Sequence, residues 1–542
     1  MPDVENTLSF ADYVVVALYL TGTILLGLWI GRRTRTGDDF FLGGRRLPWW
    51  AIGFSLVATD IGGTDIIGVG GAAHRFGIAV ANFEWIGCVP AMIVGAFVFI
   101  PFFYRTGVYT VPEFLERRYN ANVRTVMAVC WLLFMACNLG LMLVASARMM
   151  SGLFGWHEWT CIIATAVLVG FYTCVGGLAA VVYTDMIQCV VMIAGCLAIL
   201  FLGIVKVGGI SELRSRLDAI PATAEQTPAE TEDDVGNISA VEGVDARREA
   251  TSLILPVDTP SPFPWPGIFF GLALILSPAY WIGNQAIVQR SLGARSEFEA
   301  KASYVWGALL KNLIPFIVAV PGLIAIVLLP DLDNSDMAIP RLVGMLFPTG
   351  LRGLFVAAFL AALMSSIDSY LNSAATIVTH DLYRRFVNPD VSPQKTLVIG
   401  RSVTSVLVLW AVAFAFLLTQ MAEDSGLYTI FQTLMAFFQG PAFAILLIGV
   451  FWRGATGYAA FAGLLCGIAT SITLYALNQP AVYEALGWQP LFRIADPFLY
   501  FSVWAFVVTA IVLTVVSLFG PKEDIDRSRY VFRTAFGGGA AK

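Results

Sequence analysis

Charged side chains are scarce in this chain. Asp, Glu, Lys and Arg make up 13% of the 542 residues, against roughly 25% in an average soluble protein. The net charge is only -5, which argues against a nucleic-acid partner. Hydrophobic residues reach 58%, in apolar runs of about 20 residues that are long enough to cross a membrane. Because backbone groups in lipid find no water to bond, each run must be helical. The composition predicts an all-α membrane protein.

Catalytic and metal-binding residue types are also few. There are three histidines: His74 and His157 fall in expected loops, and His380 at the end of an expected helix. The eight cysteines lie within apolar runs without C-x-x-C spacing, which is typical of packing residues and not of disulfides or metal ligands. An enzyme would need a nucleophile with its base, or a metal cluster, and the sequence offers neither. We therefore expect no enzymatic activity.

The start and end of the chain bear on two further alternatives. The first residues are acidic and lack the basic start of a signal peptide, so we expect the first helix to be retained. A sensor derived from a transporter would usually carry a cytoplasmic signalling domain, for which the polar tail after Leu518 is too short. A channel is distinguished by currents without stoichiometric coupling to a solute.

We expect about thirteen transmembrane helices, with basic loops on alternate sides. The spans are 10–31, 48–72, 78–104, 122–150, 158–177, 182–205, 264–289, 302–329, 350–380, 398–419, 426–451, 457–477 and 497–519. By the positive-inside rule, the loops rich in Arg and Lys are cytoplasmic, with the N-terminus outside and the C-terminus inside. The basic residues counted on that side include Arg32, Arg33, Arg45, Arg46, Arg105, Arg117, Arg118, Arg124, Arg290, Arg295, Lys301, Arg384, Arg385, Arg453 and Lys522.

An acidic segment separates two sets of five spans, one beginning at residue 48 and the other at residue 264. Residues 206–263 are rich in Glu, Asp, Ala, Thr and Pro, and we expect a solvated external loop, whose degree of order the sequence leaves open. An odd number of spans inverts the following repeat, which is the plan of many secondary transporters. We expect an extra helix and cytoplasmic loop (1–47), repeats at 48–205 and 264–453 flanking the 206–263 loop, two further helices (454–519) and a cytoplasmic tail (520–542).

The second span is a poor continuous helix. Its centre holds Asp60 and Asp65 among several glycines, and each glycine costs about 1 kcal/mol relative to alanine. We expect the helix to unwind there, so that freed carbonyls such as those of Ala58 and Ile61 face a cation. The alternative is that the glycines allow close helix packing and the acids face a neighbouring helix.

The ninth span supplies hydroxyl groups. Ala362, Ser365 and Ser366 are spaced i, i+3 and i+4, so they share a helix face, and Asp368 follows three residues after Ser365. Hydroxyl and carbonyl oxygens suit sodium, a hard cation. Serines in membrane helices also bond back to their own helix, but a neighbouring acid and an opposing broken helix favour a cation site.

Other polar residues interrupt apolar runs. Asp185 opens the sixth span, where it is either an end charge favoured by the helix dipole or a cation ligand. The remaining polar positions either form structural pairs, such as Lys with Glu, or line a hydrated cavity that suits a hydroxyl-rich ligand. These positions are Glu84, Tyr280, Trp281, Lys311 and Gln432, with Asn138 and Gln439 as weaker candidates.

Taken together, these motifs resemble the sodium:solute symporter family, and particularly its sodium/glucose cotransporter branch. The similarity runs from about residue 38 to 453 and includes the segments 41–45 (FLGGR), 109–115 (YTVPEFL), 176–185 (GGLAAVVYTD), 284–290 (NQAIVQR), Ser365–Ser366 and 371–373. Several long motifs in the correct order are more specific than any short pattern. The resemblance implies a leucine-transporter-like fold with a five-plus-five inverted repeat and alternating access.

The resemblance also implies roles for individual residues. By matching position, the main sodium site comprises Ala58, Ile61, Ala362, Ser365 and Ser366. Asp185 matches an acid linked to sodium binding, and Asp368 falls where some two-sodium members have Thr. In the sugar-carrying branch, Glu84, Lys311 and Gln432 match hydroxyl-binding positions, and Tyr280, next to Trp281, resembles the inner aromatic gate.

The cavity departs from the sugar pattern. Asp60 and Ser277 stand where sugar carriers typically have Asn, and Asp65 where they have Gln or His. We predict a sodium-coupled symporter of the plasma membrane that imports a small polar solute, a sugar or sugar derivative, with one sodium ion or two. The alternative solutes are a polyol, an amino acid or a cation, and the oligomeric state is left open.

Overall fold

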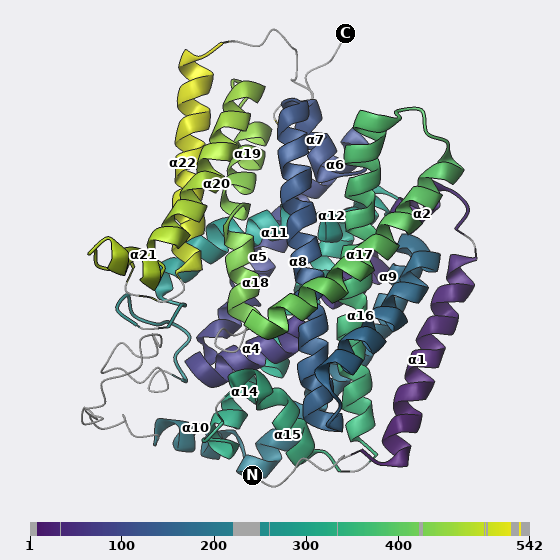
Figure 1. Ribbon diagram of the computed structural model, residues 1–542, viewed down its shortest axis with the longest axis vertical. Helices are drawn as coiled ribbons and strands as arrows, with labels where there is room; N and C mark the ends of the chain where they lie inside the picture. Colours follow the sequence, from purple (N-terminus) through teal and green to yellow (C-terminus); the bar gives the residue numbers. More distant parts are fainter. Residues whose placement is uncertain are drawn as a thin grey trace.

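The computed structural model describes residues 8–32, 34–219, 250–259, 261–332, 334–348, 350–421, 427–492, 494, 497–521 and 530–532. Within these residues the fold is a bundle of helices, in which β structure is limited to two isolated bridges. Figure 1 shows α1 at one flank of the bundle and α20 and α22 at the opposite flank. The all-α prediction is confirmed.

Nine helical segments of the described chain are long and apolar enough to span a membrane, and three bent pairs pass the same test together. These nine helices and three pairs, together with the shorter apolar helix Glu158–Phe171, lie at the positions of the thirteen predicted spans. The number of membrane spans itself stays a prediction. The long unbroken helices are α1 (Phe10–Gly31), α8 (Ala121–Phe154), α16 (Arg352–Thr376), α17 (Pro393–Met421), α20 (Gly457–Leu477) and α22 (Phe498–Phe519).

Shorter helices complete the bundle. They are α2 (Gly37–Leu42), α5 (Val89–Val94), α6 (Ile100–Thr106), α7 (Val111–Arg118), α10 (Ile210–Asp218), α13 (Glu297–Lys311), α14 (Ile314–Leu328), α15 (Ala338–Leu346) and α21 (Pro480–Ala485). The 3-10 turn η2 (Ile78–Phe83) and the π-helical segments η5 (Gly267–Leu276) and η7 (Ile377–Val387) join several of them.

The bent pairs define the interior. Helices α3 (Trp49–Asp60) and α4 (Gly63–Phe76) meet at 54°, η5 with α11 (Ser277–Gly283) meets α12 (Gln285–Leu292) at 50°, and α18 (Leu427–Ala436) meets α19 (Gln439–Phe451) at 42°. A break leaves backbone groups unpaired, and such groups are tolerated within a membrane only where protein or a cavity surrounds them. The breaks therefore mark the place where a site can be built.

Helix α9 (Glu158–Val207) joins two predicted spans through a kink at Gly177. Its φ of 70° lies in the left-handed region that favours glycine, and an added Cβ would stand 3.0 Å from the Phe40 backbone. Glycine thus serves both the turn and the close approach of α2.

Helix α16 forms the centre of the bundle. It packs against α9, α8, α1 and α3, and 94% of its most apolar window is buried, against 17% for α1. Asp12 of α1 accepts the backbone amide of Gly353 at 2.6 Å, which ties the peripheral helix to the start of α16. This central position explains why α16 can carry many hydroxyl groups away from lipid.

The acidic segment is ordered at both of its described edges. Helix α10 occupies Ile210–Asp218, and the chain after the gap packs on η2, where the Ile78 amide donates to the Ala250 carbonyl at 2.8 Å. Both edges of the segment are therefore ordered, a point that the sequence leaves open. Residues 220–249 lie outside the described residues.

Candidate functional site

The break between α3 and α4 is made by local sequence. Ile61 leaves the helix with φ -93° and ψ 91°, and the Gly62 amide donates to Asp65 Oδ2 at 2.9 Å. This bond caps the start of α4, where a carboxylate is favoured, and takes the amide that would otherwise bond the carbonyl of Ala58. A Cβ on Gly62 would stand 2.8 Å from Ser366 Oγ, so the break also permits close contact with α16.

Two serines of α16 meet the end of α3. Ser365 Oγ donates to the Ala58 carbonyl at 2.7 Å and lies 2.8 Å from the Ala362 carbonyl. Ser366 Oγ lies 3.0 Å from the Thr59 carbonyl and 3.2 Å from that of Ala362. Each hydroxyl thus bonds back to its own helix and also across to the broken one. The result is a buried cluster of neutral oxygens, the ligand type that a hard cation prefers.

A charged cluster lies beside these oxygens. Asp185 Oδ2 accepts from Ser55 Oγ at 2.6 Å and lies 3.4 Å from Arg290 Nη2. Arg290 also donates to Ser55 Oγ at 2.7 Å and to Ser369 Oγ. Ser369 in turn donates to Asp368 Oδ1 at 3.2 Å. The structure therefore brings Asp185 and Asp368 into one buried network, joined through Arg290 and serine hydroxyls.

Two expectations about this network are wrong. Asp185 does not open the sixth span, because the second part of α9 begins at the Gly177 kink and Asp185 lies two turns further on. The dipole explanation is therefore excluded. Arg290, counted among the cytoplasmic loop charges, lies fully buried in α12. Its position follows from contacts with α3, α9 and α16, which the local sequence does not reveal.

The predicted substrate residues surround a cavity of about 50 Å³. A buried water needs roughly 10–15 Å³ on this measure, so the space suits a few waters, and a hexose-sized solute requires the helices to move apart. The lining residues are Asp60, Asp65, Phe83, Glu84, Cys88, Leu272, Leu276, Ser277, Tyr280, Trp281, Tyr428, Phe431, Gln432, Met435 and Gln439. Seven of the eight predicted substrate residues are among them, and Lys311 is not.

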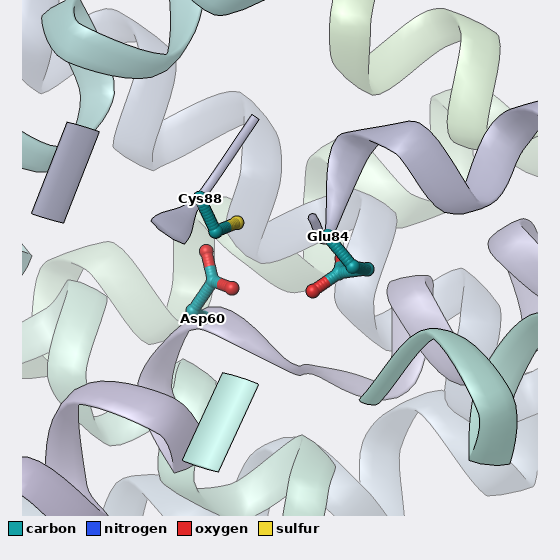
Figure 2. A group of neighbouring side chains, drawn as sticks. All are labelled: Asp60, Glu84 and Cys88. Carbon is teal, nitrogen blue, oxygen red and sulfur yellow. The ribbon is translucent and has the colours of Figure 1, made fainter. Parts of the chain in front are cut away.

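Lys311 lies behind the cavity wall as the centre of an ion-pair triad. Its ammonium bonds both Asp60 and Glu84 and lies 5.9 Å from the centre of the Trp281 ring. Figure 2 shows Asp60, Glu84 and Cys88 around a common space, with potential ligand atoms within 4.8 Å of one another. Because the ammonium already bonds both carboxylates, a metal ion held by Asp60, Glu84 and Cys88 together would have to displace it. The anticipated Lys–Glu pair is present, and Asp60 is its unforeseen third member.

Aromatic groups form one side of the cavity. The Tyr280 hydroxyl lies 3.3 Å from that of Tyr370 on α16, and the Tyr304 hydroxyl donates to the Trp281 carbonyl at 2.7 Å. These bonds hold the broken η5–α11 segment against its neighbours. Tyr428 of α18 also lines the cavity and was not foreseen, because a tyrosine in an apolar run has no distinguishing pattern.

The histidines and weaker candidates lie elsewhere, with one exception. His74 is buried inside α4, not in a loop, and its Nδ1 lies 3.0 Å from Ser335 Oγ. His380 lies within η7 and not at a helix end. Asn138 of α8 is buried and is not among the residues that line the cavity. Gln439, at the break between α18 and α19, does line the cavity.

Comparison with known proteins identifies the class. Residues 40–467 match the model of the sodium:solute symporter family. The chain is 31% identical over 512 residues to the sodium/glucose cotransporter of Vibrio parahaemolyticus, covering 90% of this chain and 89% of that protein. It is 32% identical over 550 residues to the human sodium/myo-inositol cotransporter, covering 96% and 75% of the two chains.

Solved structures agree on the fold. The chain superposes on a Na⁺-coupled sialic acid symporter in its substrate-bound outward-open state with a TM-score of 0.77 at 23% identity, covering 95% of this chain and all of that one. A nucleobase-cation-symport-1 transporter, Mhp1, gives 0.52 at 13% identity, covering 92% and 98%. The chain belongs to the sodium:solute symporter family and has the leucine-transporter-like fold. The predictions of family, fold and sodium-coupled symport are confirmed.

Proposed function

We propose that this membrane protein imports a small hydroxyl-bearing solute, a sugar or sugar derivative, together with sodium across the plasma membrane. Support comes from relatives named for glucose and myo-inositol and from a cavity lined by aromatic rings, amides and carboxylates. The basic loops favour an external N-terminus and a cytoplasmic C-terminus.

One observation carries the proposal: the contact between the broken end of α3 and the serines of α16. The sodium ion is held by the carbonyls of Ala58, Ile61 and Ala362 and the hydroxyls of Ser365 and Ser366. Because these oxygens belong to separate helices, an ion between them replaces two serine-to-carbonyl hydrogen bonds and stabilises one arrangement of α3 against α16. That differential binding is what couples the ion to the movement of the solute.

The same proposal allows either one sodium ion per transport cycle or two. Asp185 and Asp368 both lie beside the first site, and Asp185 Oδ1 is buried without a hydrogen-bond partner in the part of the chain that the structure describes. An unpaired buried carboxylate oxygen is costly, and a cation would satisfy it. Arg290 already compensates one of the two acids, so at most one further charge is favoured there.

The driving force is sufficient for accumulation. One sodium ion moving inward through about 100 mV contributes about 2.3 kcal/mol, which corresponds to roughly fifty-fold accumulation of the solute. Two ions would approximately square that ratio.

The test is uptake of labelled glucose, myo-inositol and glucosamine into proteoliposomes with a sodium gradient, compared with an equal potassium gradient. Potassium is the better replacement, since choline and N-methylglucamine are organic cations that the acidic cavity could bind. Accumulation in sodium alone is expected. Equal uptake in both salts would exclude sodium coupling.

A further inference from the structure

The charges around the cavity do not balance. Asp60, Asp65 and Glu84 all line it, whereas its lining residues include no Lys or Arg. The nearby ammonium of Lys311 bonds Asp60 and Glu84 together. With every group ionised, three negative charges face one positive charge. A buried excess of this kind is unfavourable unless a cation joins it.

The excess negative charge lies on the side of the cavity that a solute would contact. Lys311 is completely buried, while the side chains of Asp60 and Glu84 keep 12% and 8% of their surface exposed. Asp65 uses Oδ2 to cap α4, and Oδ1 accepts no hydrogen bond from a described residue. A solute entering the cavity therefore meets carboxylate oxygens from Asp60 and Asp65 before it meets any positive charge.

The remaining wall suits a cation with polar substituents. The rings of Tyr280, Trp281 and Tyr428 line the cavity, and aromatic faces attract ammonium groups. Gln439 is fully buried and lines the same cavity, yet neither its amide nitrogen nor its oxygen has a hydrogen-bond partner among the described residues. Buried amides are rarely left unpaired, so this side chain points to hydroxyl or amine groups of a ligand. Gln432 adds a second amide.

We propose that the transported solute carries a protonated amine on a hydroxyl-bearing body, as an amino sugar does. The ammonium group binds between the Asp60 and Asp65 carboxylates, and the hydroxyls bond Gln432 and Gln439. This assignment rests on the proposed sodium symport, since it names the solute of the same cavity. It selects the cationic member of the solute classes that the sequence leaves open.

The test compares three probes that differ at one position: glucosamine, glucose and N-acetylglucosamine. Their uptake is measured in proteoliposomes in mildly acidic buffer, where the amine of glucosamine is protonated. We expect the transport efficiency for glucosamine to exceed that for glucose and N-acetylglucosamine by at least about tenfold. The neutral amide of N-acetylglucosamine separates the effect of charge from that of nitrogen.

A variant of Asp65 tests whether the preference for a protonated amine arises in the cavity. Asp65→Asn keeps an oxygen that can cap α4 but removes the charge, and should lower glucosamine uptake about tenfold. The matched control is Glu212→Gln on α10, an exposed acid paired with Arg216, which should leave that uptake unchanged. Charge movement gives an independent readout, because a cationic solute carries one charge per cycle beyond those of sodium.

The outcomes separate the two proposals. Sodium-dependent uptake of glucose at the same efficiency as glucosamine overturns the amine assignment and leaves sodium symport intact. Equal uptake in sodium and potassium overturns the symport itself. If none of the three probes is transported and glucosamine does not raise the melting temperature of the purified protein, the amine assignment is also overturned.

Discussion

Replacing Ser365 by alanine removes one hydroxyl from the contact between α16 and the broken end of α3. Its Oγ lies 2.7 Å from the Ala58 carbonyl and 2.8 Å from the Ala362 carbonyl, and it is one of the proposed sodium ligands. A hydrogen bond to a charged group is worth about 1.5–3 kcal/mol, and we take a similar loss for this ion contact. Because 1.4 kcal/mol corresponds to tenfold in affinity, half-maximal uptake should require about ten to a hundred times more sodium.

The assay is solute uptake in proteoliposomes over a range of sodium concentrations. Ser373→Ala is the matched control, since Ser373 lies on the same helix, is equally buried and has a hydroxyl without a hydrogen-bond partner within the described ranges. Its sodium dependence should match that of the unchanged protein. Superimposable sodium curves for Ser365→Ala and Ser373→Ala would refute the role given to Ser365.

Three further variants test other parts of the account. Gly62→Ala places a Cβ 2.8 Å from Ser366 Oγ, so it should raise the sodium concentration for half-maximal uptake several-fold. The control is Gly22→Ala on α1, which has open space around it and should leave that concentration unchanged. The same sodium dependence of uptake in both variants would contradict the close contact. Lys311→Met leaves Asp60 and Glu84 without their shared cation and should cost about 3–5 kcal/mol of stability. The melting temperature should fall, and adding Glu84→Gln to the same chain should partly restore it. An unchanged melting temperature would count against the triad. At the surface of the bundle, burial alone would raise the pKa of Glu116, but hydrogen bonds and charge from Arg124 and Arg385 lower it below its ordinary value of 4.5. The charged form is therefore favoured by folding, and Glu116→Gln should cost about 1 kcal/mol near neutral pH, with the deficit disappearing as the pH falls below 4.5; a deficit that does not change with pH would exclude the ion pairs as its cause.

The sequence reveals the parts of the site that local chemistry determines. Gly62 followed by Asp65 makes a helix break and its cap visible in four residues. The i, i+3 and i+4 spacing of Ala362, Ser365 and Ser366 likewise puts three oxygens on one face of the helix. The family resemblance places these two segments against each other, and the structure has them in contact.

The parts that the sequence conceals depend on distant packing. Arg290 is a basic residue near an expected span end, and only its bonds to Ser55 and Ser369, 235 and 79 residues away, show that it faces inward. Asp60 similarly joins Lys311 through a contact between α3 and α13. The start of the sixth span differs for a related reason, since the helix after the Gly177 kink begins earlier than predicted and places Asp185 two turns inside it.

Equilibrium binding of radioactive sodium to the purified protein, without solute, tests the central claim most directly. Saturable binding is expected for the unchanged protein and for Ser373→Ala, and its loss in a chain carrying both Ser365→Ala and Ser366→Ala. If the double variant folds with an unchanged melting temperature and binds sodium with undiminished affinity, the ion does not lie between α3 and α16.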